Sequence, residues 1–151
     1  GGGRDEAHDR ELMERAMAQS RRSPERSSCY RVGAVVECAN GDLFEGYTLE
    51  TSPTHHAEQA AICKAQAAGA DLAGATIYSS MEPCSVRSSE PESCSQLIIR
   101  HGMRRALFAL YEPSHFVECQ GAENMRRAGV RVDVVSEYAD EVRRINSHVL
   151  D

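Results

Sequence analysis

The sequence contains no tryptophan and only three phenylalanines among its 151 residues. Aliphatic side chains must therefore form most of its core. No segment approaches the ~20 consecutive apolar residues that a membrane-spanning helix needs. The N-terminal Gly1-Gly2-Gly3 and the polar residues after it lack the apolar segment of a secretory signal, so we interpret residues 1–6 as a flexible leader. We expect a cytoplasmic protein that contacts no membrane.

Positive charge is also scarce. The chain has 17 Lys and Arg residues against 23 Asp and Glu residues, which gives a formal net charge of −6. Such a balance does not attract phosphate backbones over a broad surface, so we expect no nucleic-acid partner. The length and the 41% of apolar residues suit one domain over residues 1–151 with a real hydrophobic core. In a reducing compartment, the six cysteines favour metal binding or burial over disulfides.

Hydrophobic periodicity predicts an alternation of helices and strands. Asn40-Gly41 is a strong hairpin signal between the first two strands. Later strands are separated by helices, and such crossovers require the last three strands to run parallel, with helices on both faces of the sheet. The predicted strands are 31–38, 42–47, 75–80, 105–110 and 130–135, and the predicted helices are 9–21, 55–68, 93–101, 117–128 and 138–149.

Two short motifs carry the chemistry. His56-Ala57-Glu58 opens a predicted helix, and Glu82-Pro83-Cys84 is followed by Cys94 after nine intervening residues. A catalytic zinc takes three protein ligands of the His and Cys type and keeps a fourth position for water. We therefore predict a Zn²⁺ site with His56, Cys84 and Cys94 as ligands. Both thiolates should lie near the start of the helix at Ser93, where backbone N–H groups favour negative charge.

Glu58 is then the predicted acid and base. Its carboxylate would take a proton from water, deliver it to a ring nitrogen and later protonate the departing amine. His55 is a second ligand candidate in the same dipeptide, although the His-Ala-Glu spacing favours His56. It could instead form a wall of the pocket or point into solvent. Cys38, Cys63 and Cys119 are interpreted as core residues.

These motifs resemble the cytidine-deaminase superfamily, from the first predicted helix to the last predicted strand. Within it, the chain is most similar to the deaminase domain of the riboflavin-biosynthesis deaminase-reductase. The resemblance implies a three-layer αβα sandwich with a mixed five-stranded sheet and a homodimer or higher homo-oligomer. It rests on Arg31-Val32-Gly33, the two zinc motifs, the long gap before Cys94, and Gly102-Met103-Arg104-Arg105.

The departures from that group concern its sugar and phosphate contacts. Cys29-Tyr30 replaces an Asn-Pro pair, Thr48 replaces a His, and Val86 and Ser89 occupy the positions of a His and a cation. The sequence therefore predicts that the phosphorylated riboflavin intermediate is a poorer substrate than a base or nucleoside without phosphate. The candidate substrate contacts are Cys29, Thr48, His55, Ala57, Pro83 and Arg87.

The leading function is hydrolytic deamination of the exocyclic amine of a small heterocycle, a pyrimidine base, nucleoside or nucleotide. One alternative is deamination of a base in tRNA or another nucleic acid, which the missing basic surface disfavours. Another is a zinc-binding module without catalysis. Glu58 disfavours this second alternative, because a structural zinc site requires no carboxylate there.

Overall fold

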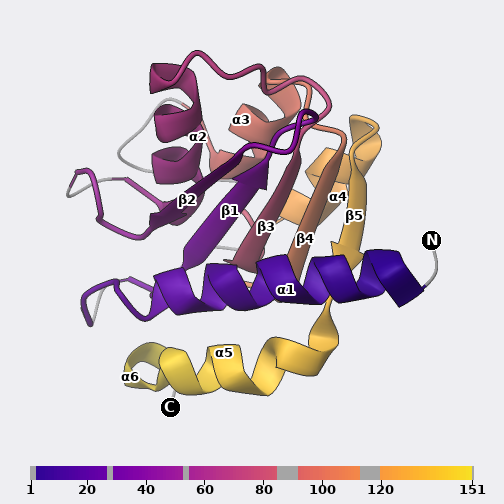
Figure 1. Cartoon of the computed structure of the whole chain (residues 1–151). Coiled ribbons are helices and arrows are strands. Elements are labelled where there is room, and N and C mark those ends of the chain that lie inside the picture. The colour runs from indigo at the N-terminus through magenta and orange to yellow at the C-terminus, as the bar shows by residue number, and fades with distance from the viewer. Residues whose placement is uncertain (1–2, 27–28, 53–54, 85–91, 113–119, 151) are drawn as a thin grey trace.

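The sheet has the strand order β2-β1-β3-β4-β5 (Figure 1). The computed structural model describes residues 3–26, 29–52, 55–84, 92–112 and 120–150. β1 pairs antiparallel with β2 and β3, whereas β3, β4 and β5 run parallel. The predicted hairpin, the three parallel strands and the mixed five-stranded sheet are all confirmed. The strands are β1 Gly33–Glu37, β2 Leu43–Tyr47, β3 Thr76–Met81, β4 Arg105–Leu110 and β5 Arg131–Val134.

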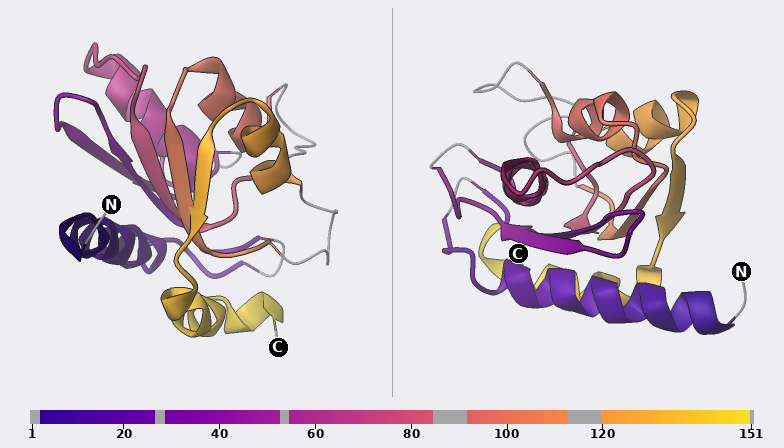
Figure 2. Two further views of the ribbon diagram at one scale, coloured as in Figure 1. Left: turned by 90° about the vertical axis from the view of Figure 1, so that its right-hand side faces the viewer. Right: turned by 45° about the horizontal axis from the view of Figure 1, so that its top comes forward.

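Helices cover both faces of the sheet, as Figure 2 shows. One face carries α1 (Gly3–Ser20), α5 (Ala139–Ile145) and α6 (Ser147–Leu150). The other face carries α2 (Ala57–Ala67), α3 (Cys94–Arg100) and α4 (Gly121–Arg127). The structure is therefore the expected three-layer αβα sandwich. No helix in the described part of the chain is long and apolar enough to cross a membrane.

The core divides into two clusters because the sheet lies between two helical layers. Ile77 and Phe108 pack with the α2, α3 and α4 side, and Tyr78 and Leu107 pack with the α1 and α5 side. β3 is buried at all six positions, as expected for a central strand covered on both faces. Most other core side chains are Ala, Val, Ile, Leu and Met.

The first and last helices differ most from the predicted ones, and one predicted helix begins outside the described residues. α1 begins at Gly3, within the segment interpreted as a leader, because exposed residues such as Glu6 extend the helix without any apolar periodicity. The predicted helix over 117–128 is described only from Gly121, since 117–119 lie outside the described residues. The predicted last helix is a 3₁₀ turn (Ser136–Tyr138) followed by α5 and α6, with a break at Asn146.

Gly46 in β2 allows α2 to lie unusually close to the sheet. A Cβ at this position would lie 2.7 Å from both the Ala57 carbonyl oxygen and the Ala61 amide nitrogen. Only a residue without a side chain fits this contact. Because α2 carries Glu58 in its first turn, Gly46 also sets the position of that carboxylate.

Gly46→Ala should push α2 away from β2. Overpacking of this kind commonly costs about 1–3 kcal/mol of unfolding free energy, and we expect turnover to fall as Glu58 moves. Urea denaturation and steady-state kinetics measure the two effects. Ala67→Leu, at an exposed position of the same helix, should change stability by less than about 0.5 kcal/mol. Equal stability of the two variants would contradict the close contact.

Candidate active site

A nitrogen and two sulfurs converge where two helices begin. His56 is the N-cap residue of α2, Cys94 is the first residue of α3, and Cys84 follows the end of β3. The His56 Nδ1 atom lies 3.5 Å from the Cys84 Sγ atom and 3.4 Å from the Cys94 Sγ atom. All three donor atoms lie within 4.8 Å of one another. The structure thus brings together the three predicted ligands.

The donor atoms fit a zinc ion. Zinc–nitrogen and zinc–sulfur bonds of about 2.1 and 2.3 Å at a tetrahedral angle separate the two atoms by about 3.6 Å. The observed nitrogen–sulfur distances lie close to this value. One imidazole and two thiolates are also the soft donor set that zinc prefers over magnesium or calcium. His56, Cys84 and Cys94 could therefore hold the ion without rearrangement.

Cys84 is prepared for metal binding by its neighbours. The Cys94 thiol, then the His56 imidazole and the Cys94 backbone N–H, hold the pKa of the Cys84 thiol well below its usual range, against the opposing effect of burial. The Cys94 N–H lies 3.4 Å from the Cys84 sulfur. A capping box between Ser93 and Gln96 fixes this first turn of α3. The predicted position of both sulfurs at the start of α3 is confirmed.

Glu58 shares a cavity of about 750 Å³ with the metal cluster. Glu58 is the second residue after His56, in the first turn of α2, and it is only 3% exposed. Three segments supply most of the remaining wall: the chain between α1 and β1, the chain between β2 and α2, and the end of β3. The lining residues are Pro24, Arg26, Cys29, Tyr30, Val32, Thr48, Leu49, Glu50, Thr51, Ser52, His56, Glu58, Met81, Glu82, Cys84 and Glu112.

Two of the candidate substrate contacts, Cys29 and Thr48, line this cavity. The Thr48 hydroxyl is already engaged, because it accepts a hydrogen bond of 3.0 Å from the Val32 N–H. Burial raises the pKa of the Cys29 thiol above its usual value, while Arg26 opposes this shift. Cys29 is therefore a neutral thiol rather than a nucleophile at physiological pH.

The other candidate contacts are not among the cavity-lining residues of the described chain. The His55 Nδ1 atom lies 2.8 Å from the Thr51 hydroxyl oxygen, so the His55 ring is bonded to the chain between β2 and α2. Ala57 is fully buried at the start of α2. The Pro83 carbonyl packs so tightly against Gly121 that a Cβ there would lie 1.8 Å from its oxygen. Arg87, Val86 and Ser89 lie outside the described residues.

The sequence motifs gave no role to Glu82 and did not mark Glu50 or Glu112. Glu82 is nearly buried, and its two carboxylate oxygens accept hydrogen bonds from the Glu112 N–H at 3.2 Å and the Ala122 N–H at 2.9 Å. It thereby ties the end of β4 and the start of α4 to the metal-binding segment. The Glu50 carboxylate is paired with the Lys64 ammonium at 2.6 Å. Only the parallel pairing of β3 with β4 could have indicated Glu112.

Arg26 is the one cation among the described cavity-lining residues. It lies in the polar chain segment after α1, and no motif distinguishes it there from its neighbours Arg21 and Arg22. Four carboxylates line the same cavity, from Glu50, Glu58, Glu82 and Glu112. Within the described part of the chain, the cavity wall can therefore bind hydrogen-bond donors at several points and an anionic side group near Arg26.

The sequence is similar to those of known proteins. Residues 6–110 match the family described as the cytidine and deoxycytidylate deaminase zinc-binding region. The chain is 34% identical over 137 residues to the diaminohydroxyphosphoribosylamino-pyrimidine deaminase of Schizosaccharomyces pombe, covering 89% of this chain and 34% of that protein. It is 37% identical over 115 residues to the riboflavin biosynthesis protein RibD of Aquifex aeolicus, covering 76% and 31%. The chain thus spans about a third of the length of these curated relatives.

Solved structures share the fold. A diaminohydroxyphosphoribosylaminopyrimidine deaminase/reductase from Thermotoga maritima superimposes with a TM-score of 0.82 at 29% identity, covering 92% of this chain and 39% of that one. A cyanophage S-TIM5 dCMP deaminase gives 0.67 at 21% identity, covering 85% and 98%, which shows the fold alone. With its donor atoms at zinc-binding distances and a family match across most of its length, the chain belongs to the cytidine and deoxycytidylate deaminase family of zinc-dependent deaminases.

Proposed function

We propose that this chain hydrolyses the exocyclic amine of an aminopyrimidine, with His56, Cys84 and Cys94 as zinc ligands and Glu58 as the proton-transfer group. The observation that carries the proposal is the placement of Glu58, a buried carboxylate in the same cavity as the metal cluster. A structural zinc site would need no such group. The reaction converts the C–NH₂ group of the ring and one water into a C=O group and ammonia.

Zinc, when bound, would lower the pKa of a water molecule toward neutrality, so that hydroxide is available at physiological pH. The protein's own contribution is proton transfer by Glu58. Its carboxylate first takes a proton from the water and delivers it to the ring nitrogen beside the reacting carbon. It then takes the remaining proton of the hydroxyl group added to that carbon and passes it to the departing amine, as the C=O bond forms and the C–N bond breaks. Burial suits this work, because a carboxylate removed from bulk water exchanges its proton with the substrate rather than with solvent.

The size and charge of the cavity also indicate what kind of substrate it binds. Its volume lies within the usual range for small-molecule sites, and the named activity of the S. pombe relative concerns a phosphoribosylamino-pyrimidine. Arg26 could supply the cation that a phosphate requires. We therefore propose an aminopyrimidine that carries a phosphorylated sugar-derived chain. This reverses the ranking of phosphorylated and unphosphorylated substrates that was predicted from Cys29, Thr48, Val86 and Ser89. That prediction did not take Arg26 into account.

Nucleic acid is disfavoured as a substrate because carboxylates outnumber cations among the described cavity-lining residues. A tRNA deaminase would bind tRNA tightly at low salt, which a filter-binding assay tests.

Homo-oligomerisation stays a proposal. Its support is Tyr111, the one large apolar side chain exposed in the described residues, which adjoins cavity-lining Glu112. Sedimentation velocity would measure the assembly.

The function as a whole is tested by ammonia release from a panel of aminopyrimidines and aminopurines. Each compound is supplied as the free base, the nucleoside and the phosphorylated form. Release from an aminopyrimidine supports the proposal, and release from an aminopurine alone would contradict the substrate class. If no compound releases ammonia from the zinc-loaded protein, the catalytic proposal fails.

Replacing either thiolate should remove the metal. Cys84→Ala or Cys94→Ala leaves two protein ligands, and we expect less than one tenth of the zinc of the unsubstituted protein after dialysis against a weak chelator. Elemental analysis measures the zinc-to-protein ratio. Cys63→Ala is the matched control, because Cys63 lies on α2 outside the cluster and should keep one zinc per chain. Full zinc occupancy in either cluster variant would refute the ligand assignment.

Glu58→Gln should preserve the fold and the zinc but lower kcat. General acid–base groups contribute about 10²–10⁴-fold, and the loss could be larger here because Glu58 acts at several steps. Steady-state ammonia release measures kcat, with zinc content determined on the same sample. Glu11→Gln, which changes an exposed carboxylate on α1, serves as the control. Near-normal turnover in Glu58→Gln would show that another group transfers the proton.

Arg26→Ala should weaken binding of a phosphorylated substrate only. A lost hydrogen bond to a charged group costs about 1.5–3 kcal/mol, so we expect KM to rise about 10- to 100-fold for the phosphorylated aminopyrimidine. KM for the same compound without phosphate should not change. Arg126→Ala, at an exposed position on α4, is the control. Equal KM changes for both compounds would rule out Arg26 as the phosphate contact.

A further inference from the structure

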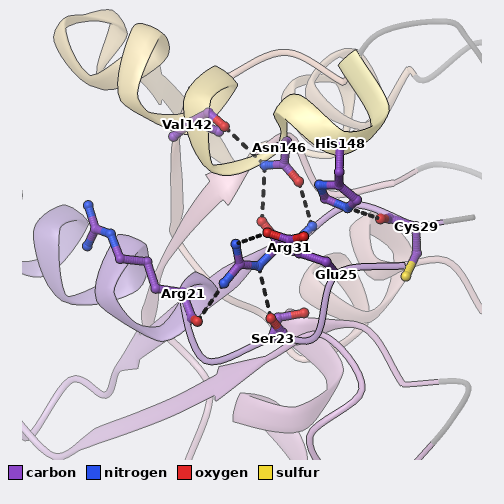
Figure 3. A network of polar contacts seen from close by, with 8 residues as sticks. All are labelled: Arg21, Ser23, Glu25, Cys29, Arg31, Val142, Asn146 and His148. Carbon is purple, nitrogen blue, oxygen red and sulfur yellow. Dashed lines mark hydrogen bonds and ion pairs between the residues drawn. The ribbon is translucent and has the colours of Figure 1, made fainter. Parts of the chain in front are cut away.

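Asn146 connects the C-terminal helices to the wall of the cavity. It lies at the break between α5 and α6 and is fully buried (Figure 3). Its side-chain oxygen accepts a hydrogen bond of 2.6 Å from the Arg31 N–H, and its side-chain nitrogen donates one of 3.2 Å to the Arg31 carbonyl. The same nitrogen donates to the Val142 carbonyl at 3.1 Å. The amide therefore pairs with both backbone groups of one residue in a segment more than a hundred positions away.

Arg31 lies between residues that line the cavity. It directly follows the cavity-lining Cys29 and Tyr30, and it precedes Val32, which also lines the cavity. Fixing the Arg31 peptide groups therefore fixes the direction of the cavity residues on both sides of it. His148 adds a second contact from the same C-terminal segment, since its Nε2 atom lies 3.2 Å from the Cys29 carbonyl oxygen.

The Arg31 side chain extends this connection toward α1. Its guanidinium donates to the Ser23 carbonyl at 2.9 Å and to the Arg21 carbonyl at 2.6 Å, as Figure 3 shows. The segment that carries Arg26 is thus held at its start by the guanidinium of Arg31 and at its end by Asn146. These contacts hold both ends of the polar segment between α1 and β1.

Asn146 also contacts a cavity-lining residue at the end of β3. Its side-chain nitrogen lies 3.8 Å from the Met81 sulfur. Met81 lines the cavity, ends β3 and leads directly into Glu82-Pro83-Cys84. One buried amide is therefore in contact with Arg31, which lies between cavity-lining Tyr30 and Val32, and with the strand that leads to the metal-binding segment.

We propose that Asn146 is a positioning residue that sets the width of the cavity at the end that receives the substrate's sugar or phosphate group. The proposal rests on the proposed function. The side chain of Asn146 bonds to the Arg31 and Val142 backbone and contacts Met81, so its loss should impair substrate binding more than the chemical step. An ordinary structural residue would lower stability without separating KM from kcat.

The decisive variant is Asn146→Asp. Aspartate keeps an acceptor for the Arg31 N–H but places a carboxylate against the Arg31 and Val142 carbonyls, where a donor is required. We expect KM for the phosphorylated aminopyrimidine to rise at least about tenfold. The zinc content should stay at one per chain and kcat within about threefold of the unsubstituted protein. Asn40→Asp, the same change in the exposed β1–β2 turn, should leave all three values unchanged.

Amide hydrogen exchange gives a readout that does not depend on turnover. The Arg31 N–H should exchange faster in Asn146→Asp, whereas amides of β4 and β5 keep their protection. If Asn146→Asp does not fold, His148→Ala removes only the contact to the Cys29 carbonyl and should raise KM about threefold. An unchanged KM in whichever variant folds overturns the proposal. Failure of the proposed function would be seen separately, as absence of turnover in the unsubstituted protein.

Discussion

The sulfurs of two buried cysteines and the imidazole nitrogen of half-buried His56 lie within 4.8 Å of one another, and the rest of the molecule is arranged around this contact. Two thiolates cannot both stay ionised at this separation in a protein interior unless a cation neutralises them. Their environment already favours the charged form at Cys84, through Cys94 and His56. The site thus creates a concentration of negative charge that only a bound dication balances, and zinc suits these donors.

The topology of the sheet explains how these atoms meet. β3 is the central strand, and its C-terminal end delivers Cys84 next to the N-termini of α2 and α3. Because β3 and β4 are parallel, the end of β4 reaches the same edge of the sheet and brings Glu112 to the cavity. The Glu82 carboxylate then accepts hydrogen bonds from the backbone N–H groups of Glu112 and Ala122. A carboxylate in the Glu-Pro-Cys motif therefore serves as a structural connection between two loops.

Local signals made the metal site predictable. His56 and Glu58 are two residues apart at the start of one helix, so their relation hardly depends on tertiary structure. The strands were equally clear, since alternating apolar runs and the Asn40-Gly41 turn are short-range features. Arg26 and Asn146 carry no such signal. The partner of Asn146 lies 115 positions away, and a buried asparagine in an amphipathic helix resembles any polar residue of the exposed face until the structure is known.

The charge distribution explains how an acidic cavity could accept an anion. Two of its four carboxylates are locally compensated: Glu50 by the Lys64 ammonium, and Glu82 by two backbone N–H groups. The potential near Arg26 is therefore less negative than the composition of the wall suggests. Arg26 is joined to Cys29 through a backbone hydrogen bond from the Cys29 N–H to the Arg26 carbonyl, and the Cys29 carbonyl in turn contacts His148. If the proposed substrate binds with its charged group at Arg26, its recognition would depend on the C-terminal helices, which lie on the opposite face of the sheet from α2 and α3. The affinity for that group should then vary with the packing of these helices.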